Sequence, residues 1–182
     1  MLMNKREEII QLAISFIKKY SFQELSFGYL AEQLNITKAA IHYYFKNKTD
    51  LGIAICEHLE ETFKQQQLYF EQHSELSAYQ SLEKRIAFLS DGEICPAVSL
   101  QSDLNKYDEA LQKKVIELAE VEYHTYVQIL ARKMDLEQAQ ILAQAHLASI
   151  KGARIYNRTL AIPFEQTILE RVKKEINEVE RT

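Results

Sequence analysis

The chain has 182 residues, of which 47% are hydrophobic and 26% charged, and its formal net charge is −4 at pH 7. This composition is ordinary for a globular protein, and the chain is long enough to form a packed core. No apolar run approaches the roughly 20 residues that a membrane-spanning helix needs, and no signal-like apolar segment follows Met1. We therefore expect a cytoplasmic protein that does not associate with a membrane.

Four glycines and two prolines leave few residues that form tight turns. Apolar residues recur at helical spacing through most of the chain, without an internal repeat, a low-complexity tract or a flexible linker. These patterns predict an all-α fold with short connections. The two cysteines, Cys56 and Cys95, are too few for a disulfide framework and suit a reducing compartment.

The first predicted helix covers residues 4–20. Its apolar residues fall on one stripe, which consists of Ile9, Ile10, Ala13, Phe16, Ile17 and Tyr20. We expect this helix to support the segment that follows it.

Residues 26–51 read SFGYLAEQLNITKAAIHYYFKNKTDL and predict two short helices, a tight turn between them and the start of a third helix. Ser26 and Thr37 are suitable N-cap residues for the two short helices. Asn35 lies between these helices and tolerates the left-handed conformation that a sharp turn requires. The second short helix directs Ala40, Ile41 and Tyr44 inward, and its outward face consists of Thr37, Lys38, His42 and Tyr43. This is the arrangement of a helix-turn-helix unit.

A long helix is predicted over residues 48–72. Asn47 and Asp50 form a start that resembles a capping box. Lys48 lies at this start, where free backbone amides and the helix dipole favour a bound phosphate. We expect this helix to connect the helix-turn-helix unit to the rest of the chain and to transmit changes between them.

Four more long helices are predicted from periodicity and end signals. They cover residues 75–90, closed by a glycine C-cap at Gly92, then 108–133, 135–160, and a last helix that begins with Pro163. Residues 93–106 are the least regular stretch, because Pro96 interrupts them, and they are predicted to contain one short helix.

The run ITKAAIHYYFKNKTDL, preceded by FGYLAEQL and by the helix from residue 5, resembles the DNA-binding domain of TetR/AcrR-family transcriptional regulators. The match extends from about Lys5 to Gly52. The resemblance implies a DNA-binding helix-turn-helix domain over residues 1–50. It also implies a helical domain over residues 51–182 that binds a ligand and forms the dimer. On this resemblance the residues expected to contact DNA are Ser26, Tyr29, Thr37, Lys38, Ala39, Ala40, His42, Tyr43 and Lys48.

Three positions depart from the usual family pattern. Asn35 stands where the family commonly has glycine, and its backbone conformation is acceptable there. Ala39 replaces a glycine on the recognition helix, and its methyl group can contact a thymine methyl. His42 replaces a tyrosine that commonly contacts DNA, so the contact made at that position is left open.

The last two predicted helices suggest a dimer interface. Ala145, Ala148, Ser149 and Gly152 place small side chains on one side of a helix, while Ile168, Val172 and Ile176 form an apolar stripe on the next. The resemblance implies that such helices pair with those of a second copy as a four-helix bundle. The alternative is that the stripe packs only inside one subunit.

An effector pocket is expected among aromatic residues of the second domain. The candidates are Phe63, Phe70, Phe88, Tyr107, Tyr123, Tyr126 and His146. Each of them can instead be an ordinary core residue. Cys95 lies in an irregular Glu-Ile-Cys-Pro segment and is either a thiol sensor or inert packing. No histidine has a second ligand at metal-like spacing, so we expect no metal and no cofactor.

The sequence therefore predicts a homodimeric DNA-binding repressor that an unknown small molecule releases from double-stranded operator DNA. Alternatives are a helical small-molecule-binding protein without DNA binding, and a redox- or electrophile-sensing regulator that acts through Cys95. An enzyme is not expected, because no phosphate-binding glycine loop, nucleophile elbow or paired cysteine motif is present.

Overall fold

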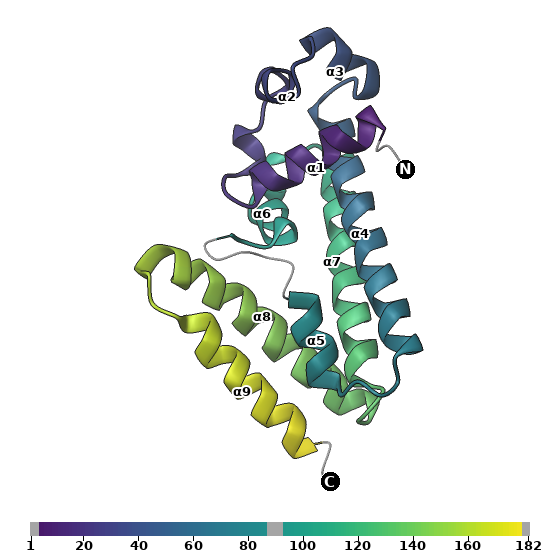
Figure 1. Ribbon diagram of the computed structural model, residues 1–182, viewed down its shortest axis with the longest axis vertical. Coiled ribbons are helices and arrows are strands. Elements are labelled where there is room, and N and C mark those ends of the chain that lie inside the picture. Colours follow the sequence, from purple (N-terminus) through teal and green to yellow (C-terminus); the bar gives the residue numbers. More distant parts are fainter. Residues whose placement is uncertain (1–3, 87–92, 180–182) are drawn as a thin grey trace. The chain divides into compact units, whose positions relative to one another are not determined.

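Figure 1 shows the computed structural model of the chain, which describes residues 4–86 and 93–179. Across these residues the chain is helical and contains no strand, so the all-α prediction is confirmed. In chain order the elements are α1 (Lys5–Ile17), η1 (Phe22–Glu24), α2 (Phe27–Gln33), α3 (Lys38–Tyr44), α4 (Lys48–Gln72), α5 (Ala78–Ile86), α6 (Pro96–Ser102), η2 (Leu104–Lys106), α7 (Glu109–Leu130), α8 (Leu136–Leu160) and α9 (Phe164–Val179). Within the described ranges, no helix has the length and apolar content needed to cross a membrane.

The chain divides into two compact units. The first contains the residues up to Glu61 together with Cys95–Ala119, and the second contains Thr62–Ile94 and the residues from Glu120 onward. Helices α4 and α7 contribute residues to both units. This division follows packing, and the functional boundary near residue 50 stays a prediction.

Side-chain caps set several helix starts. The Ser26 hydroxyl oxygen accepts from the Tyr29 amide at 3.1 Å, and Thr37 Oγ1 accepts from the Ala40 amide at the same distance. An N-cap of this kind stabilises a helix by about 1 kcal/mol. Between α2 and α3, Asn35 has a φ of 51°, as its ability to adopt the left-handed conformation predicts.

The first unit has an apolar core built from α1 to α4 and the start of α7. Leu30 and Ile41 are fully buried there, as are other apolar side chains of the unit. Gly52 allows close packing in this core, because a Cβ atom at that position would lie 2.8 Å from Leu111 Cδ2 and 3.0 Å from Phe22 Cζ.

The second unit has its own core, which includes residues of α5, α8 and α9 and the adjoining parts of α4 and α7. Its buried members include Phe70, Leu82, Ile129, Ile150 and Ile176. The apolar stripe of α9 therefore faces the interior of this unit.

Several predicted boundaries differ from the structure. Helix α1 ends at Ile17 rather than residue 20, because Ser21 accepts from the Glu24 amide at 3.3 Å and starts η1. Tyr20 is consequently exposed. Pro163 precedes α9 instead of beginning it, since Asn157 Oδ1 accepts from the Glu165 amide at 3.0 Å and caps that helix from the end of α8.

The remaining differences concern shorter segments. Helix α5 begins at Ala78, and the predicted C-cap at Gly92 lies outside the described residues. The irregular stretch contains α6 and also η2, where one short helix was expected. Tyr44 was predicted to face inward but is 36% exposed, because its ring packs edge-to-face on the exposed Tyr43 ring.

Candidate functional site

Helix α3 has one buried side and one exposed side. Ile41 is fully buried, which fixes the helix on the core of the first unit. Lys38, Ala39, His42 and Tyr43 are exposed, and Ala40 is half-buried. Tyr43, at 84% exposure, is free to contact another molecule over most of its surface. A short, capped helix with this exposed face is suited to insertion into the major groove of DNA.

The two capping hydroxyls lie at the starts of α2 and α3. Ser26 and Thr37 are exposed, and each uses its oxygen to accept from a helix amide. Each hydroxyl hydrogen remains able to donate to a phosphate oxygen. Tyr29 is half-buried, and its ring packs 4.8 Å from the Phe16 ring.

His42 is held in one orientation by two neighbours. Its Nδ1 lies 3.2 Å from the Lys46 carbonyl oxygen, and its ring packs edge-to-face on Phe27 at 4.9 Å. A carbonyl only accepts, so Nδ1 carries the hydrogen of this bond. Nε2 is then the ring atom that can meet DNA.

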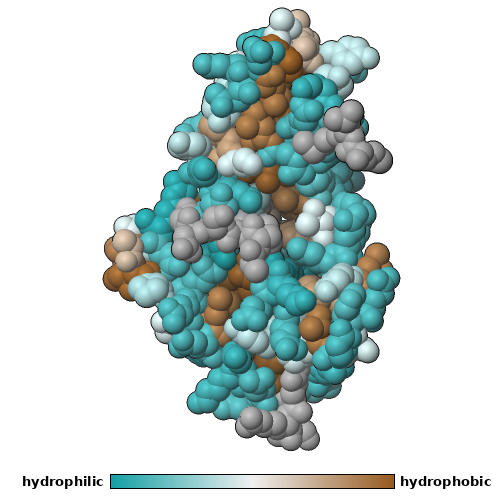
Figure 2. All heavy atoms as spheres, in the orientation of Figure 1, coloured by the Kyte–Doolittle hydropathy of each residue, from teal (hydrophilic) through white to brown (hydrophobic). Residues whose placement is uncertain are grey.

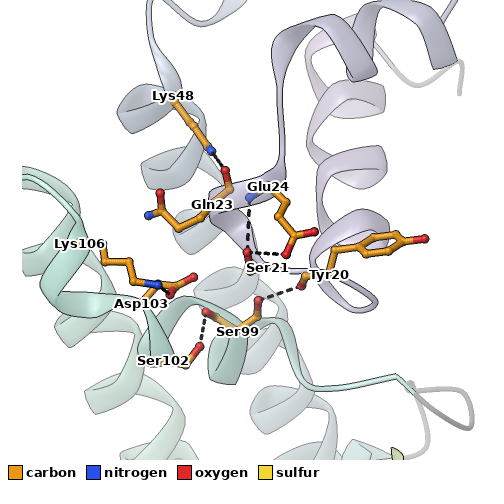
Figure 3. Close-up of polar contacts among 9 residues, drawn as sticks. All are labelled: Tyr20, Ser21, Gln23, Glu24, Lys48, Ser99, Ser102, Asp103 and Lys106. Atoms are coloured by element: carbon orange, nitrogen blue, oxygen red, sulfur yellow. Dashed lines mark hydrogen bonds and ion pairs between the residues drawn. The ribbon is translucent and has the colours of Figure 1, made fainter.

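Lys48 bridges the start of α4 and η1. Its ammonium donates to the Gln23 carbonyl oxygen at 2.7 Å (Figure 3). The same ammonium lies 5.0 Å from the centre of the Phe22 ring. Burial lowers the pKa of Lys48, and the nearby Asp103 carboxylate opposes that shift. The predicted capping residues also act here, since Asn47 Oδ1 accepts from the Asp50 amide at 2.8 Å.

The segment from Tyr20 to Glu24 is held from two sides in the first unit. Ser99 on α6 donates to the Tyr20 carbonyl oxygen at 3.3 Å, and Lys48 holds the Gln23 carbonyl (Figure 3). Ser102 in turn donates to the Ser99 carbonyl at 2.9 Å. These contacts fix the connection that leads into α2.

The aromatic pocket candidates do not form one cluster. The second unit contains Phe63, Phe70, Tyr123, Tyr126 and His146. Tyr107 belongs to the first unit, and Phe88 lies outside the described residues. Phe70 lines a groove of about 310 Å³ together with Tyr69, Gln66 and Lys84. A larger groove of about 530 Å³ is lined by residues that sequence reasoning missed, among them Tyr79, Glu83, Leu169 and Lys173.

A buried polar cluster in the second unit was also missed from the sequence. Arg85 is 4% exposed, and its guanidinium carbon lies 4.6 Å from the centre of the Phe63 ring. Its contacts include Thr125 Oγ1 at 2.8 Å and the Glu122 carbonyl at 3.3 Å. Arg85 follows Leu82 by three residues on α5, so helical spacing places it on the buried side of that helix.

Comparison with known proteins gives one family match. Residues 9–55 match the family of bacterial regulatory proteins called the tetR family. The whole chain also superposes on solved structures of such regulators. One is a TetR transcriptional regulator from Legionella pneumophila, with a TM-score of 0.86, 24% identity and 97% of each chain covered. The chain has the TetR-family fold.

Two further structures agree with this fold. A TetR-family regulator from Agrobacterium tumefaciens has a TM-score of 0.79 and 16% identity, covering 96% of this chain and 97% of its own. The reduced form of Escherichia coli NemR has a TM-score of 0.76 and 17% identity, with 97% of each chain covered. No curated protein matches the sequence. The TetR-family fold supports a DNA-binding transcriptional regulator, and such regulators are generally not enzymes.

The predicted dimer residues of this chain fall into two groups. Ala145, Ala148 and Ser149 are exposed on α8, and a Cβ atom added at Gly152 would meet nothing within 4 Å. Val172 and Ile176 are instead buried in the core of their own unit, and Ile168 is half-buried against it. We call the exposed side of α8 at Ala145, Ala148, Ser149 and Gly152 its open face. The larger exposed apolar residues of α8 are Ile141, Ile155 and Tyr156.

The turn between α8 and α9 adds another exposed apolar area. Leu160 and Ile162 are each about half exposed in this segment. Figure 2 shows hydrophobic side chains gathered over the same turn. This area continues the apolar residues at the end of α8.

Both cysteines are buried as thiols, and whether Cys95 is a sensor stays a prediction. Cys95 is buried directly before α6, and burial raises the pKa of the Cys56 thiol to about 12. Within residues 4–86 and 93–179, no three His, Cys, Asp or Glu side chains lie close enough to hold a metal ion.

Proposed function

We propose that the chain is a sequence-specific transcriptional repressor that binds operator DNA and is released by a small molecule. The observation that supports this most is the exposed face of α3. Lys38, His42 and Tyr43 project from a helix whose opposite side, at Ile41, is fixed in the core. Base edges are read from such a face, and the proposal assigns sequence discrimination to Lys38 and His42. It also implies that the protein acts in the cytoplasm, where operator DNA lies.

The phosphate contacts in this proposal come from the residues that surround α3. Ser26, Thr37 and Tyr43 offer hydroxyl groups, and Lys48 offers an ammonium at the start of α4. Contacts to phosphate fix the position of a protein on the duplex without reading its sequence. Ala39 and Ala40 lie on the helix between these groups and permit close approach.

A homodimer completes the proposal. One short helix reads only a few base pairs, whereas two copies related by a two-fold axis read half-sites roughly 34–36 Å apart. The open face of α8, with its small residues and the free space at Gly152, supports an interface with a second copy. The effector is assigned to the second unit, which contains both described aromatic grooves and the Arg85 cluster.

Electrophoretic mobility shift tests the proposal directly. The full chain is titrated onto the DNA upstream of its own gene and onto a shuffled duplex of equal length and composition. We expect retardation of the upstream DNA at concentrations at least tenfold lower, since specific binding typically exceeds non-specific binding by about 10³–10⁷. Tyr43→Ala tests the exposed face, and Gln140→Ala on α8 is the control. Equal retardation of both duplexes by the wild-type chain would refute the proposal.

A further inference from the structure

The interior of the second unit contains a tyrosine hydroxyl that no described group of the protein satisfies. Tyr126 is 2% exposed, and its hydroxyl oxygen has no hydrogen-bond partner among the described residues. Buried polar atoms are nearly always paired, because an unpaired one is energetically unfavourable. A phenylalanine would fill the same space without this penalty. The hydroxyl is therefore suited to a partner that comes from outside the chain.

The surroundings of Tyr126 favour a negatively charged partner. The Arg85 guanidinium carbon lies 5.9 Å from the centre of the Tyr126 ring, and Glu122, on the same helix, pairs with Lys151 of α8. Arg85, Lys151 and the Arg171 that pairs with Glu175 are three cations against the two carboxylates of Glu122 and Glu175, so this cluster has a net positive charge. Burial raises the pKa of the Tyr126 hydroxyl above its usual range, so the hydroxyl stays protonated and can donate. A carboxylate is the acceptor that both the hydroxyl and the net charge favour.

A second unsatisfied atom lies on the neighbouring helix α8. The His146 ring packs edge-to-face on Tyr126, with 6.4 Å between the ring centres, and the residue is 1% exposed. Its Nε2 lies 3.0 Å from Glu175 Oε2, while its Nδ1 has no partner among the described residues. The carboxylate of Glu175 accepts from Nε2, so Nδ1 of a neutral imidazole presents a lone pair. Nδ1 of His146 therefore requires a hydrogen-bond donor as its partner.

We propose that Tyr126, Arg85 and His146 bind a small organic carboxylate that also carries a hydrogen-bond donor such as a hydroxyl group. The carboxylate accepts from Tyr126 in the positive field of Arg85, and the donor meets His146 Nδ1. The Phe63 ring, which packs on Arg85, offers an apolar wall to the body of the ligand. This inference rests on the proposed function, because it names the chemistry of the effector.

The same arrangement explains how such a ligand would act. Tyr126 is 2% exposed and does not line either of the two aromatic grooves described above, so the proposal has the ligand reach its hydroxyl by opening the interior of the second unit. The ligand then binds an opened arrangement better than the closed one. Such differential affinity is the requirement for a ligand to shift a conformational equilibrium.

Thermal unfolding of the full chain with matched probes tests the proposal. The probes are 4-hydroxybenzoate, benzoate and 4-hydroxybenzamide, which differ in one group at a time. We expect the melting temperature to rise most with 4-hydroxybenzoate, less with benzoate and least with the amide, because only a ligand bound to the folded state stabilises it. Equal or greater stabilisation by the amide would overturn the carboxylate assignment, and so would an unchanged melting temperature with all three probes.

Two variants assign the effect to the hydroxyl. Tyr126→Phe is expected to weaken 4-hydroxybenzoate binding by about 10- to 100-fold, the loss of one hydrogen bond to a charged group. Tyr79→Phe is the matched control in the same unit, since its hydroxyl already donates to Glu83 at 3.3 Å. Without probe, Tyr126→Phe should not lower the melting temperature. A lower melting temperature of Tyr126→Phe without probe would overturn the assignment. Equal weakening of probe binding in Tyr126→Phe and Tyr79→Phe would overturn it as well.

Mobility shift on the same samples separates this inference from the proposed function. A chain that binds the acid but retards no upstream DNA refutes the repressor and supports the site. A chain that retards that DNA but binds neither acid refutes the site and supports the repressor. Release of the DNA by 4-hydroxybenzoate in the wild type, but not in Tyr126→Phe, supports both.

Discussion

The ammonium of Lys48 donates to the carbonyl oxygen of Gln23 at 2.7 Å, which joins the start of α4 to η1. Gln23 lies three residues before Ser26, the N-cap of α2. Lys48 therefore positions the connection into the helix-turn-helix unit, in addition to any phosphate that it meets. These two roles are separable, because one concerns the stability of the fold and the other concerns the salt dependence of DNA binding.

Lys48→Met should lower the free energy of unfolding by about 1 kcal/mol, since a hydrogen bond to a partly exposed charged group is lost. The same variant should reduce the slope of log affinity against log salt by about 1, as loss of one phosphate contact does. Denaturant unfolding and salt titrations of operator binding measure these effects. The control is Lys46→Met, at an exposed neighbouring lysine. An unchanged salt slope would leave Lys48 with the positioning role alone.

Ala161 ends α8 in the left-handed conformation, with a φ of 53°. A side chain in this region is unfavourable by roughly 1–2 kcal/mol, whereas glycine adopts it readily. Ala161→Gly should therefore raise the free energy of unfolding by about 1 kcal/mol. Chemical denaturation measures the change. The control is Ala148→Gly in the middle of α8, which should lower stability by roughly 0.5–1 kcal/mol.

The helix-turn-helix unit was predictable because local signals specify it. Ser26, Thr37 and Asn35 act on backbone groups within a few residues of themselves, so their effects can be read from sequence. The bond from Lys48 to Gln23 was not predictable, because it joins residues 25 positions apart. The prediction of Lys48 as a phosphate contact used only the local helix start and the family resemblance.

The interior of the second unit was less predictable for the same reason. Arg85 shares the buried side of α5 with Leu82, yet a charged residue on an amphipathic helix usually marks the solvent side. Its burial depends on Phe63 and Thr125, which come from two other helices. Tyr126 and His146 were named as pocket candidates from residue type alone, without a signal for their unsatisfied atoms.

His146 should make stability depend on pH. Burial lowers its pKa from the ordinary value of 6.5, and the bond to Glu175 only partly opposes this shift. Between the lowered value and 6.5 the unfolded chain binds more protons than the folded chain, so stability increases with pH in that window. The melting temperature should fall as pH decreases below 6.5.

The variant His146→Phe tests whether this histidine is the cause. Just below pH 6.5 the melting temperature of His146→Phe should decrease less steeply than that of the wild type. His124→Phe is the control, because His124 is exposed on α7. Glu175 also has a lowered pKa, but its contribution is lost only at more acidic pH, below its ordinary value of 4.5. Equal slopes in wild type and His146→Phe would show that other groups are responsible.

Gly152 tests the proposed dimer with little disturbance of the single chain. A Cβ atom at this position meets nothing within 4 Å, so a leucine side chain can be accommodated within one subunit. Leucine also favours a helix over glycine by about 0.8–1 kcal/mol. If α8 packs closely on a second copy at this point, the leucine separates the two helices. Gly152→Leu should then be a folded monomer with weakened operator binding, because two half-sites are no longer read together.

Sedimentation velocity and circular dichroism check this outcome together. Gln140→Leu is the matched control, an exposed residue twelve positions earlier and so about 120° around the same helix at 3.6 residues per turn. It adds a similar apolar side chain away from the Gly152 face and should leave the dimer intact. If Gly152→Leu sediments as a dimer and binds the operator normally, the face of α8 at Gly152 is not the interface. The exposed apolar residues at the α8–α9 turn, Leu160 and Ile162, would then be the next surface to alter.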